Sequence, residues 1–204
     1  MLEATDLIIS RGERLLIDEL DVRVNAGEVL HVTGPNGSGK TTLLRTLAGL
    51  TLPEEGTVCW HGENIRRDGG TFRAALLWVG HQPGIKLELT PTENLRVFAH
   101  LHGSPSLAPE EALTRIGLGE RLTLPCRHLS AGQRRRVALA RLLCEPAEAW
   151  ILDEPFTALD RSAVAALEAR LAEHAGAGGI TVLTSHQPVQ LDGLTVRHLE
   201  LGNG

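Results

Sequence analysis

Short apolar runs alternate with stretches of helical spacing along this chain, and together they predict an α/β structure. Short, almost wholly apolar runs are typical of strands buried on both faces of a sheet. They occupy residues 28–33, 75–80, 149–152 and 179–184. Residues 2–9 and 21–24 instead alternate apolar and polar positions, which indicates antiparallel strands with one solvated face. Residues 56–60 are predicted as a further strand.

Helical spacing of leucine and alanine marks the predicted helices. They occupy residues 43–49, 91–100, 109–116, 130–143 and 162–173. The second and third begin with proline and early acidic residues, as helix starts do. Ser130 is suited to cap the fourth. Because strands resume only after residue 145, the pattern predicts a helical subdomain inserted between strands.

A glycine-rich loop joins the first buried strand to the first helix. Its residues are Gly34, Pro35, Asn36, Gly37, Ser38, Gly39, Lys40, Thr41 and Thr42. They match the phosphate-loop pattern G-x-x-x-x-G-K-[ST] in the strand–loop–helix context that the pattern requires. The glycines let successive backbone N–H groups face a polyphosphate, and the helix N-terminus adds its positive end.

Three side chains of this loop have chemistry suited to a nucleoside triphosphate. Lys40 supplies an ammonium for the β- and γ-phosphates, and the Thr41 hydroxyl can ligate Mg²⁺. Thr42 can add a hydroxyl contact to phosphate. The sequence contains only one other lysine, Lys86. The loop therefore predicts a site for ATP and Mg²⁺.

Two acids end the buried strand at 149–152. Adjacent carboxylates at such a place are costly unless a cation compensates them. We expect Asp153 to hold Mg²⁺, directly or through water. We expect Glu154 to be the general base that orients the attacking water.

Other polar residues follow the ends of further strands and helices. Ligands gather at the carboxyl ends of parallel strands, so Gln82 is a candidate ligand of Mg²⁺ or water, and His186 can donate to the γ-phosphate. Small Ser130 and Gly132 leave the amides of a helix N-terminus open as a second anion site. Asp160 is either the cap of the last helix or a functional residue.

Composition narrows the function classes. The 204 residues are 42% apolar, enough for one core or one core with a smaller lobe. The net charge of −5 argues against a nucleic-acid coat protein, and we expect Arg134, Arg135 and Arg136 to form a solvated helical face. No apolar run approaches a membrane span, and residues 1–6 do not resemble a signal peptide. We expect a soluble protein whose membrane role requires a partner.

Taken together, the motifs resemble those of ABC transporter nucleotide-binding subunits. They are, in chain order, the phosphate loop, Gln82, residues 129–133, residues 151–154, residues 158–160 and His186. The resemblance implies a P-loop NTPase of the ABC ATPase type. Its mixed central sheet would carry an N-terminal antiparallel β subdomain and an inserted α-helical subdomain. It also implies one domain over 1–204, with 83–145 as the helical lobe and 1–82 plus 146–204 as the remainder.

The same resemblance implies that two copies work together. Each ATP would lie between the phosphate loop of one copy and Ser130, Gly132 and Gln133 of the other. Asp160 would signal across this interface, and Gln82 would couple the nucleotide to a membrane partner. Such proteins usually stack adenine on an aromatic residue, but Arg11 occupies that place here. Its guanidinium plane can stack instead, or adenine is held loosely.

Residues 76–86, 150–160 and 184–188 resemble more narrowly the CcmA family, the haem-exporter ATPases of cytochrome c maturation. That resemblance implies CcmB-like and CcmC-like membrane subunits, a peripheral place on the cytoplasmic face of the bacterial inner membrane, no nucleic-acid partner and no haem site in this chain. Two alternatives stay open. One is an ATPase of another small-substrate exporter; the other is a soluble ABC ATPase that acts on nucleic acid or ribosomes.

Overall fold

The computed structural model describes residues 1–67, 69–102 and 106–202, and its strands form two sheets. The antiparallel sheet has the order β2-β1-β4-β5, from β1 (Leu2–Arg11), β2 (Arg14–Val24), β4 (Glu55–Trp60) and β5 (Glu63–Asn64). The parallel sheet has the order β6-β7-β8-β3-β9, from β3 (Val29–Thr33), β6 (Leu76–Val79), β7 (Ala149–Leu152), β8 (Ile180–Thr184) and β9 (Val196–Glu200). The predicted fold with parallel and antiparallel strands is confirmed, but within the described residues the central sheet is parallel rather than mixed, because the antiparallel strands form a separate sheet.

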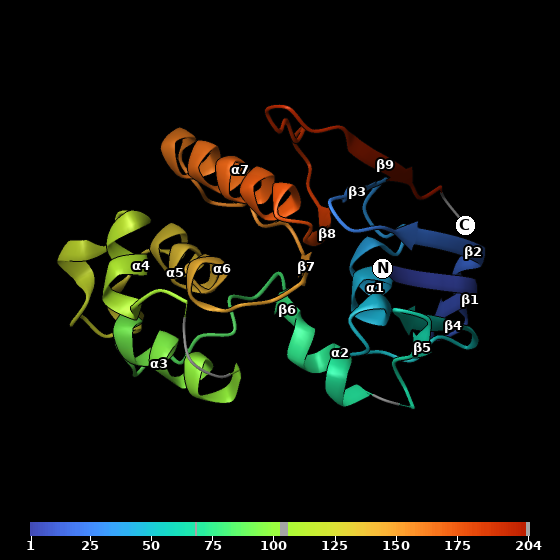
Figure 1. Ribbon diagram of the computed structural model, residues 1–204, viewed down its shortest axis with the longest axis horizontal. Helices are drawn as coiled ribbons and strands as arrows, with labels where there is room; N and C mark the ends of the chain where they lie inside the picture. Colours follow the sequence, from blue (N-terminus) through green and yellow to red (C-terminus); the bar gives the residue numbers. More distant parts are fainter. Residues whose placement is uncertain (68, 103–105, 203–204) are drawn as a thin grey trace.

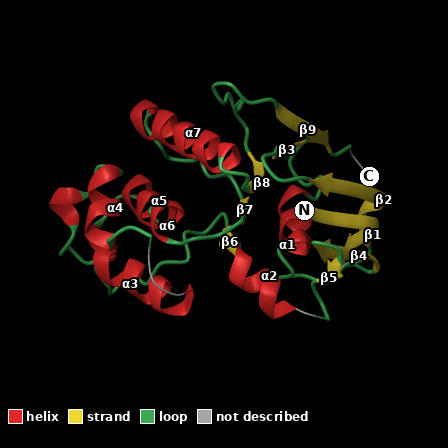
Figure 2. Cartoon of the chain, viewed as in Figure 1, coloured by secondary structure: helices red, strands yellow, loops and turns green. Residues whose placement is uncertain are grey.

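The helices separate into a group beside the sheets and a group away from them (Figures 1 and 2). The first group is α1 (Lys40–Leu47), α2 (Gly69–Ala75) and α7 (Arg161–Gly176). The second group is α3 (Pro91–His102), α4 (Pro109–Arg115), α5 (Ala131–Leu139) and α6 (Arg141–Cys144), with the short 3₁₀ turns η1 (Gly119–Arg121) and η2 (Cys126–His128). Among the described residues, no helix is long and apolar enough to cross a bilayer.

Two predicted elements differ in detail, and α2 and β9 were not predicted. The helix predicted over 130–143 is two helices, because Ala140 interrupts the helical pattern between α5 and α6. Ala75 ends α2 rather than beginning a strand, and β9 was not predicted at all. Both missed elements have weak signals. The α2 segment starts with two glycines, which are poor helix formers, and none of the β9 residues is fully buried.

Helix α1 lies at the centre of the main core. Its leucines Leu43, Leu44 and Leu47 are fully buried in one cluster with residues of both sheets. A second cluster covers the other face of the parallel sheet, where α7 packs. The distant helices have a third cluster of their own, around Leu95, Leu113 and Val137. Since α1 starts at Lys40, this burial fixes the position of the phosphate loop.

A stacked pair of rings joins α7 to β7. Trp150 is 1% exposed, and its ring lies parallel to that of His174 with centroids 3.6 Å apart. Burial lowers the pKa of His174 to about 4, so the imidazole is neutral near pH 7. A Cβ at Gly179 would lie 2.2 Å from the His174 ring, so the turn before β8 can approach α7 only because residue 179 lacks a side chain.

Replacing Gly179 with alanine therefore tests the packing of α7. We expect Gly179→Ala to lower the free energy of unfolding by about 1–3 kcal/mol, because the new methyl group overlaps a ring that cannot move. Gly176→Ala is the matched control, since nothing lies within 4 Å of its Cβ position at the end of α7. It should leave stability unchanged or raise it. Urea denaturation followed by tryptophan fluorescence measures both, and equal effects would contradict the proposed overlap.

Candidate functional site

The phosphate loop has a backbone that only glycine adopts readily. Gly34 has φ 138°, and a Cβ there would lie 2.5 Å from the carbonyl oxygen of Leu201. Gly39 caps α1 with φ 96°, in the left-handed region that favours glycine. The chain can therefore turn from β3 into α1 without side chains that would fill the concave side of the loop.

Lys40 and Ser38 supply polar groups to this loop. The Lys40 ammonium donates to the carbonyl oxygens of Gly34 at 2.7 Å and Pro35 at 2.9 Å. Ser38 is 2% exposed, and its hydroxyl has no partner among the described residues. A buried hydroxyl without a partner is uncommon, because its desolvation is not offset. An ammonium and an unpaired hydroxyl beside open glycine amides fit a phosphate group.

A buried carboxylate connects the loop to two strand ends. Asp153 follows β7 and is 1% exposed. The Thr41 hydroxyl, at the start of α1, lies 3.0 Å from Asp153 Oδ2 and 3.2 Å from Oδ1. The Thr184 hydroxyl, at the end of β8, donates to Oδ1 at 2.8 Å. The hydroxyl and carboxylate oxygens of Thr41 and Asp153 are ligands of the kind that Mg²⁺ prefers, so these residues fit the ion.

Glu154 is held in an unusual conformation beside an imidazole. Its φ is 51°, in a region that side chains other than glycine rarely adopt. Its N–H donates to the Thr184 hydroxyl at 2.9 Å. Its Oε1 lies 3.5 Å from Nε2 of His186, whose side chain is 66% exposed. The two residues predicted to act on a water and a phosphate are therefore neighbours in the structure.

Gln82 lies in the loop after β6, the strand next to β7, and it is exposed. The backbone N–H of Asp153 donates to the carbonyl oxygen of Val79 at 2.8 Å, which aligns the ends of β6 and β7. No hydrogen bond within the described residues holds the Gln82 side chain. It is free to turn toward a ligand at this edge of the sheet.

The second predicted anion site is the start of α5. Ser130 caps this helix: its hydroxyl accepts from the Gln133 N–H at 3.2 Å, and its own N–H donates to Gln133 Oε1 at 2.9 Å. A Cβ at Gly132 would lie 2.5 Å from the carbonyl oxygen of Ala158, so glycine permits close contact with the segment after Glu154. The cap predicted at Ser130 is confirmed.

Asp160 is also a cap. Its carboxylate accepts from the Ala163 N–H at 2.9 Å at the start of α7, and it pairs with Arg136. The hydrogen bond from Ala163 is the main reason that the pKa of Asp160 is lowered. The capping alternative is thus confirmed, and the ion pair additionally joins the last turn of α5 to the start of α7.

The prediction of a solvated arginine face is wrong for Arg135. This side chain is 4% exposed, and its guanidinium donates to carbonyl oxygens at the ends of β6 and β7. The periodicity of α5 does not predict the burial of Arg135, because the carbonyl oxygens that accept its hydrogen bonds belong to strands distant in the sequence. Burial lowers the pKa of Arg135 to about 10.

Two arginines flank the hairpin between β1 and β2, and Arg14 lies near the phosphate loop. Arg11, predicted to stack on adenine, is exposed and pairs with Arg14 across the hairpin. The Arg14 guanidinium has its Nη1 3.9 Å from the Cβ position of Gly37 in the phosphate loop. No local pattern singles out Arg14, because its approach to the loop depends on the hairpin geometry.

The fold and the loop are those of a P-loop ATP-binding protein with an inserted helical subdomain. The family model of ABC transporters matches residues 17–157. The chain therefore belongs to the ABC transporter family.

Its relatives within that family include ATP-binding export proteins of cytochrome c biogenesis. The chain is 51% identical over 204 residues to the cytochrome c biogenesis ATP-binding export protein CcmA 1 of Salmonella paratyphi A, covering 100% of this chain and 98% of that protein. It is 52% identical to CcmA of Nitrosococcus oceani over 93% of this chain and 88% of that protein. A solved ATP-binding subunit of an ABC transporter is 28% identical over 91% of this chain and 79% of that chain, with a TM-score of 0.81.

Two threonines of β8 offer a test of how Asp153 is held. Thr184→Val removes a donor to the buried carboxylate and the acceptor for the Glu154 N–H. We expect it to lower the free energy of unfolding by about 1–3 kcal/mol. Thr181→Val is the matched control, because Thr181 is equally buried and its hydroxyl has no partner among the described residues. It should be neutral or stabilising in urea denaturation. Losses of the same size in both variants would show that the Thr184 hydroxyl is not needed.

Proposed function

We propose that this chain is the ATP-hydrolysing subunit of a membrane ABC complex for cytochrome c biogenesis. In such a complex, ATP-driven closure of a dimer would be coupled to haem export or to release of a haem-loaded chaperone. The observation that carries the proposal is the Asp153–Glu154 pair, which lies beside the phosphate-loop residue Thr41 at the ends of parallel strands. Full-length similarity to CcmA proteins supports the biological setting.

The phosphate loop would bind the triphosphate. Backbone amides of the loop and the Lys40 ammonium would surround its phosphates, and Thr42 would add a hydroxyl. Thr41, Asp153 and Gln82 would hold Mg²⁺, which supplies positive charge next to the β- and γ-phosphates. The positive φ values of Gly34, Gly37 and Gly39 support this use, because they keep the amide side of the loop open.

Hydrolysis would use Glu154 and His186 together. Glu154 accepts a proton from the attacking water and orients it toward the γ-phosphate. His186 donates a hydrogen bond to the same phosphate group, and Gln82 orients water from the neighbouring strand end. The 3.5 Å separation of Glu154 and His186 supports their joint action on one water and one phosphate.

Two copies would complete each site. Helix α5, which begins next to Ser130, lies in the distant helix group, whereas α1 lies between the sheets (Figure 1). One chain therefore holds its two anion sites apart, and a second copy can supply Ser130, Gly132 and Gln133 to the phosphate loop of the first. Asp160 would report this contact through α7. Arg11 would stack on adenine by its guanidinium plane.

The partners would be integral membrane subunits of the CcmB and CcmC type, with this chain peripheral on the cytoplasmic face of the inner membrane. We propose that residues 83–145 act as one helical lobe within a single domain of residues 1–204. The groove for the membrane subunit would be formed by residues 82–89 and nearby helices. Leu87 and Val97 support this proposal, since both are large apolar side chains with exposures of 39% and 46%.

Glu154→Gln tests the chemistry. We expect ATP to bind and to hold the closed dimer, while the hydrolysis rate falls about 10²-fold or more, because glutamine cannot accept the proton. Lys40→Ala is the contrasting variant: it should weaken ATP binding itself, as measured by calorimetry. Normal turnover of Glu154→Gln would refute its role as base.

Affinity purification from detergent-solubilised membranes tests the biological setting. The tagged full chain should retain an integral membrane subunit and no nucleic acid. Leu87→Asp should abolish this retention without weakening ATP binding, because a charge at the proposed groove must be desolvated. Leu15→Asp, on strand β2 and 43% exposed, is the matched control and should retain the subunit. Recovery of ribosomes or DNA in place of a membrane protein would refute the proposal.

A further inference from the structure

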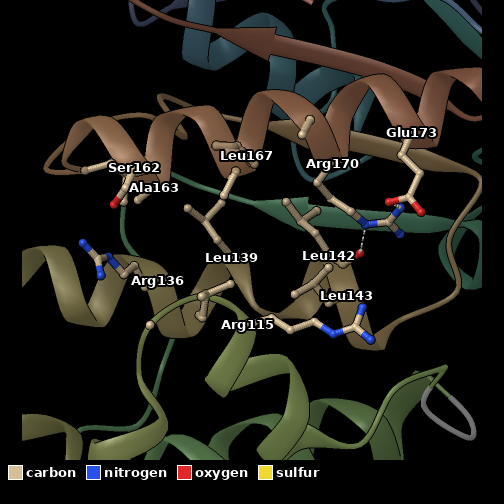
Figure 3. Close-up of a pocket in the computed structure, with 15 residues that line it drawn as sticks. Arg115, Arg136, Leu139, Leu142, Leu143, Ser162, Ala163, Leu167, Arg170 and Glu173 are labelled. Atoms are coloured by element: carbon tan, nitrogen blue, oxygen red, sulfur yellow. Dashed lines mark hydrogen bonds and ion pairs between the residues drawn. The ribbon is translucent and has the colours of Figure 1, made fainter.

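The contact between the distant helices and α7 is incomplete. A pocket of about 600 Å³ lies between α5–α6 and α7, and Leu139, Leu142 and Leu167 are among the residues that line it (Figure 3). Close apolar packing would fix the distance between these helices, but here part of that packing is missing. Ala138, Leu139 and Leu142 still pack in one buried cluster with α7 and the parallel sheet, and hydrogen bonds add a second kind of connection between α5 and the sheet.

Arg135 makes the most extensive of these links. Its Nη1 donates to the carbonyl oxygens of Gly80 at 2.7 Å and His81 at 3.4 Å, just after β6. Its Nη2 donates to the carbonyl oxygens of Asp153 and Glu154, both at 2.8 Å, just after β7. The two ends of the guanidinium thus reach the two strand ends that carry Gln82 and the acid pair.

A buried arginine is an energetically unfavourable residue at position 135. Within the described residues, no carboxylate lies at ion-pair distance from Arg135, and its Nε has no partner. Burial of the charge is opposed by desolvation, which is why the pKa of Arg135 is lowered to about 10. A buried charge that meets only carbonyl oxygens costs more to desolvate than an apolar side chain of similar volume. A need other than stability would explain arginine here.

The conformation of the Glu154 backbone provides a reason for arginine at position 135. Its φ of 51° is strained for a residue with a side chain, at a cost on the order of 1 kcal/mol. Thr184 holds the N–H of Glu154, and Arg135 holds its carbonyl oxygen. Both peptide groups next to the strained residue are therefore fixed, one by β8 and the other by α5.

We propose that Arg135 is a positioning residue that ties the orientation of Glu154 and of the Gln82 loop to the position of helix α5. This inference rests on the proposed roles of Glu154 and Gln82. When α5 moves with its anion site, the guanidinium moves the carbonyl oxygens at both strand ends. The carboxylate of Glu154 then reaches its working orientation only when α5 is in place.

Arg135→Met is the test, with Arg135→Lys beside it. Methionine fills the space but leaves carbonyl oxygens at both strand ends without this donor, so the melting temperature should fall moderately while the full chain stays folded at the assay temperature. Its kcat for ATP should fall about 10- to 100-fold, while KM and the Kd for ATP stay within about twofold, because only orientation is lost. Lysine retains the charge but cannot bridge both strand ends, so its kcat should be intermediate.

Arg134→Met is the matched control. Arg134 is the preceding residue of α5, but its guanidinium donates to the carbonyl oxygens of Leu129 and Arg127, both outside the two strand ends. It should keep normal kcat. The inference is wrong if Arg135→Met keeps normal kcat, if unfolding at the assay temperature accounts for its loss of kcat, or if Arg134→Met loses as much kcat. Glu154→Gln, assayed in parallel, separates the two proposals, since its normal turnover would refute the role of Glu154 itself.

Discussion

The buried carboxylate of Asp153 is the constraint on which the arrangement of the site depends. It accepts hydrogen bonds from Thr41 and Thr184, which come from the start of α1 and the end of β8. Leaving a buried carboxylate without one of its hydrogen bonds costs about 1–3 kcal/mol, so these hydroxyls hold the elements together. The phosphate loop, the end of β7 and the end of β8 thereby meet at one edge of the parallel sheet. Glu154 and His186 are positioned as a consequence.

The parts of the site that the sequence predicts are those with a local cause. The phosphate loop needs its glycines for its own backbone, and the acids at 153 and 154 stand out because they end an apolar run. Ser130 and Asp160 were recognisable as caps because a cap and its helix are adjacent in sequence. Strand β9 was missed, since an edge strand with little burial has no clear hydrophobic pattern.

The parts that could not be predicted have distant causes. Arg135 is buried because carbonyl oxygens more than a dozen residues away accept its hydrogen bonds. Arg14 lies near the phosphate loop because of the hairpin geometry. Neither fact is contained in the residues that flank these arginines. Arginine in a charged run predicts solvent exposure on average, but here the tertiary structure buries Arg135 and leaves Arg134 and Arg136 only partly exposed.

The capping box at the start of α5 also decides which of its amides a phosphate could reach. The N–H groups of Ser130 and Gln133 are occupied by each other's side chains. Within the described part of the chain, the N–H groups of Ala131 and Gly132 have no acceptor. Selection of an incoming anion at this helix end would thus be made by two neighbouring peptide groups in the first turn. A side chain larger than hydrogen at position 132 would displace the Ala158 backbone, and so disturb the geometry of both donors at once.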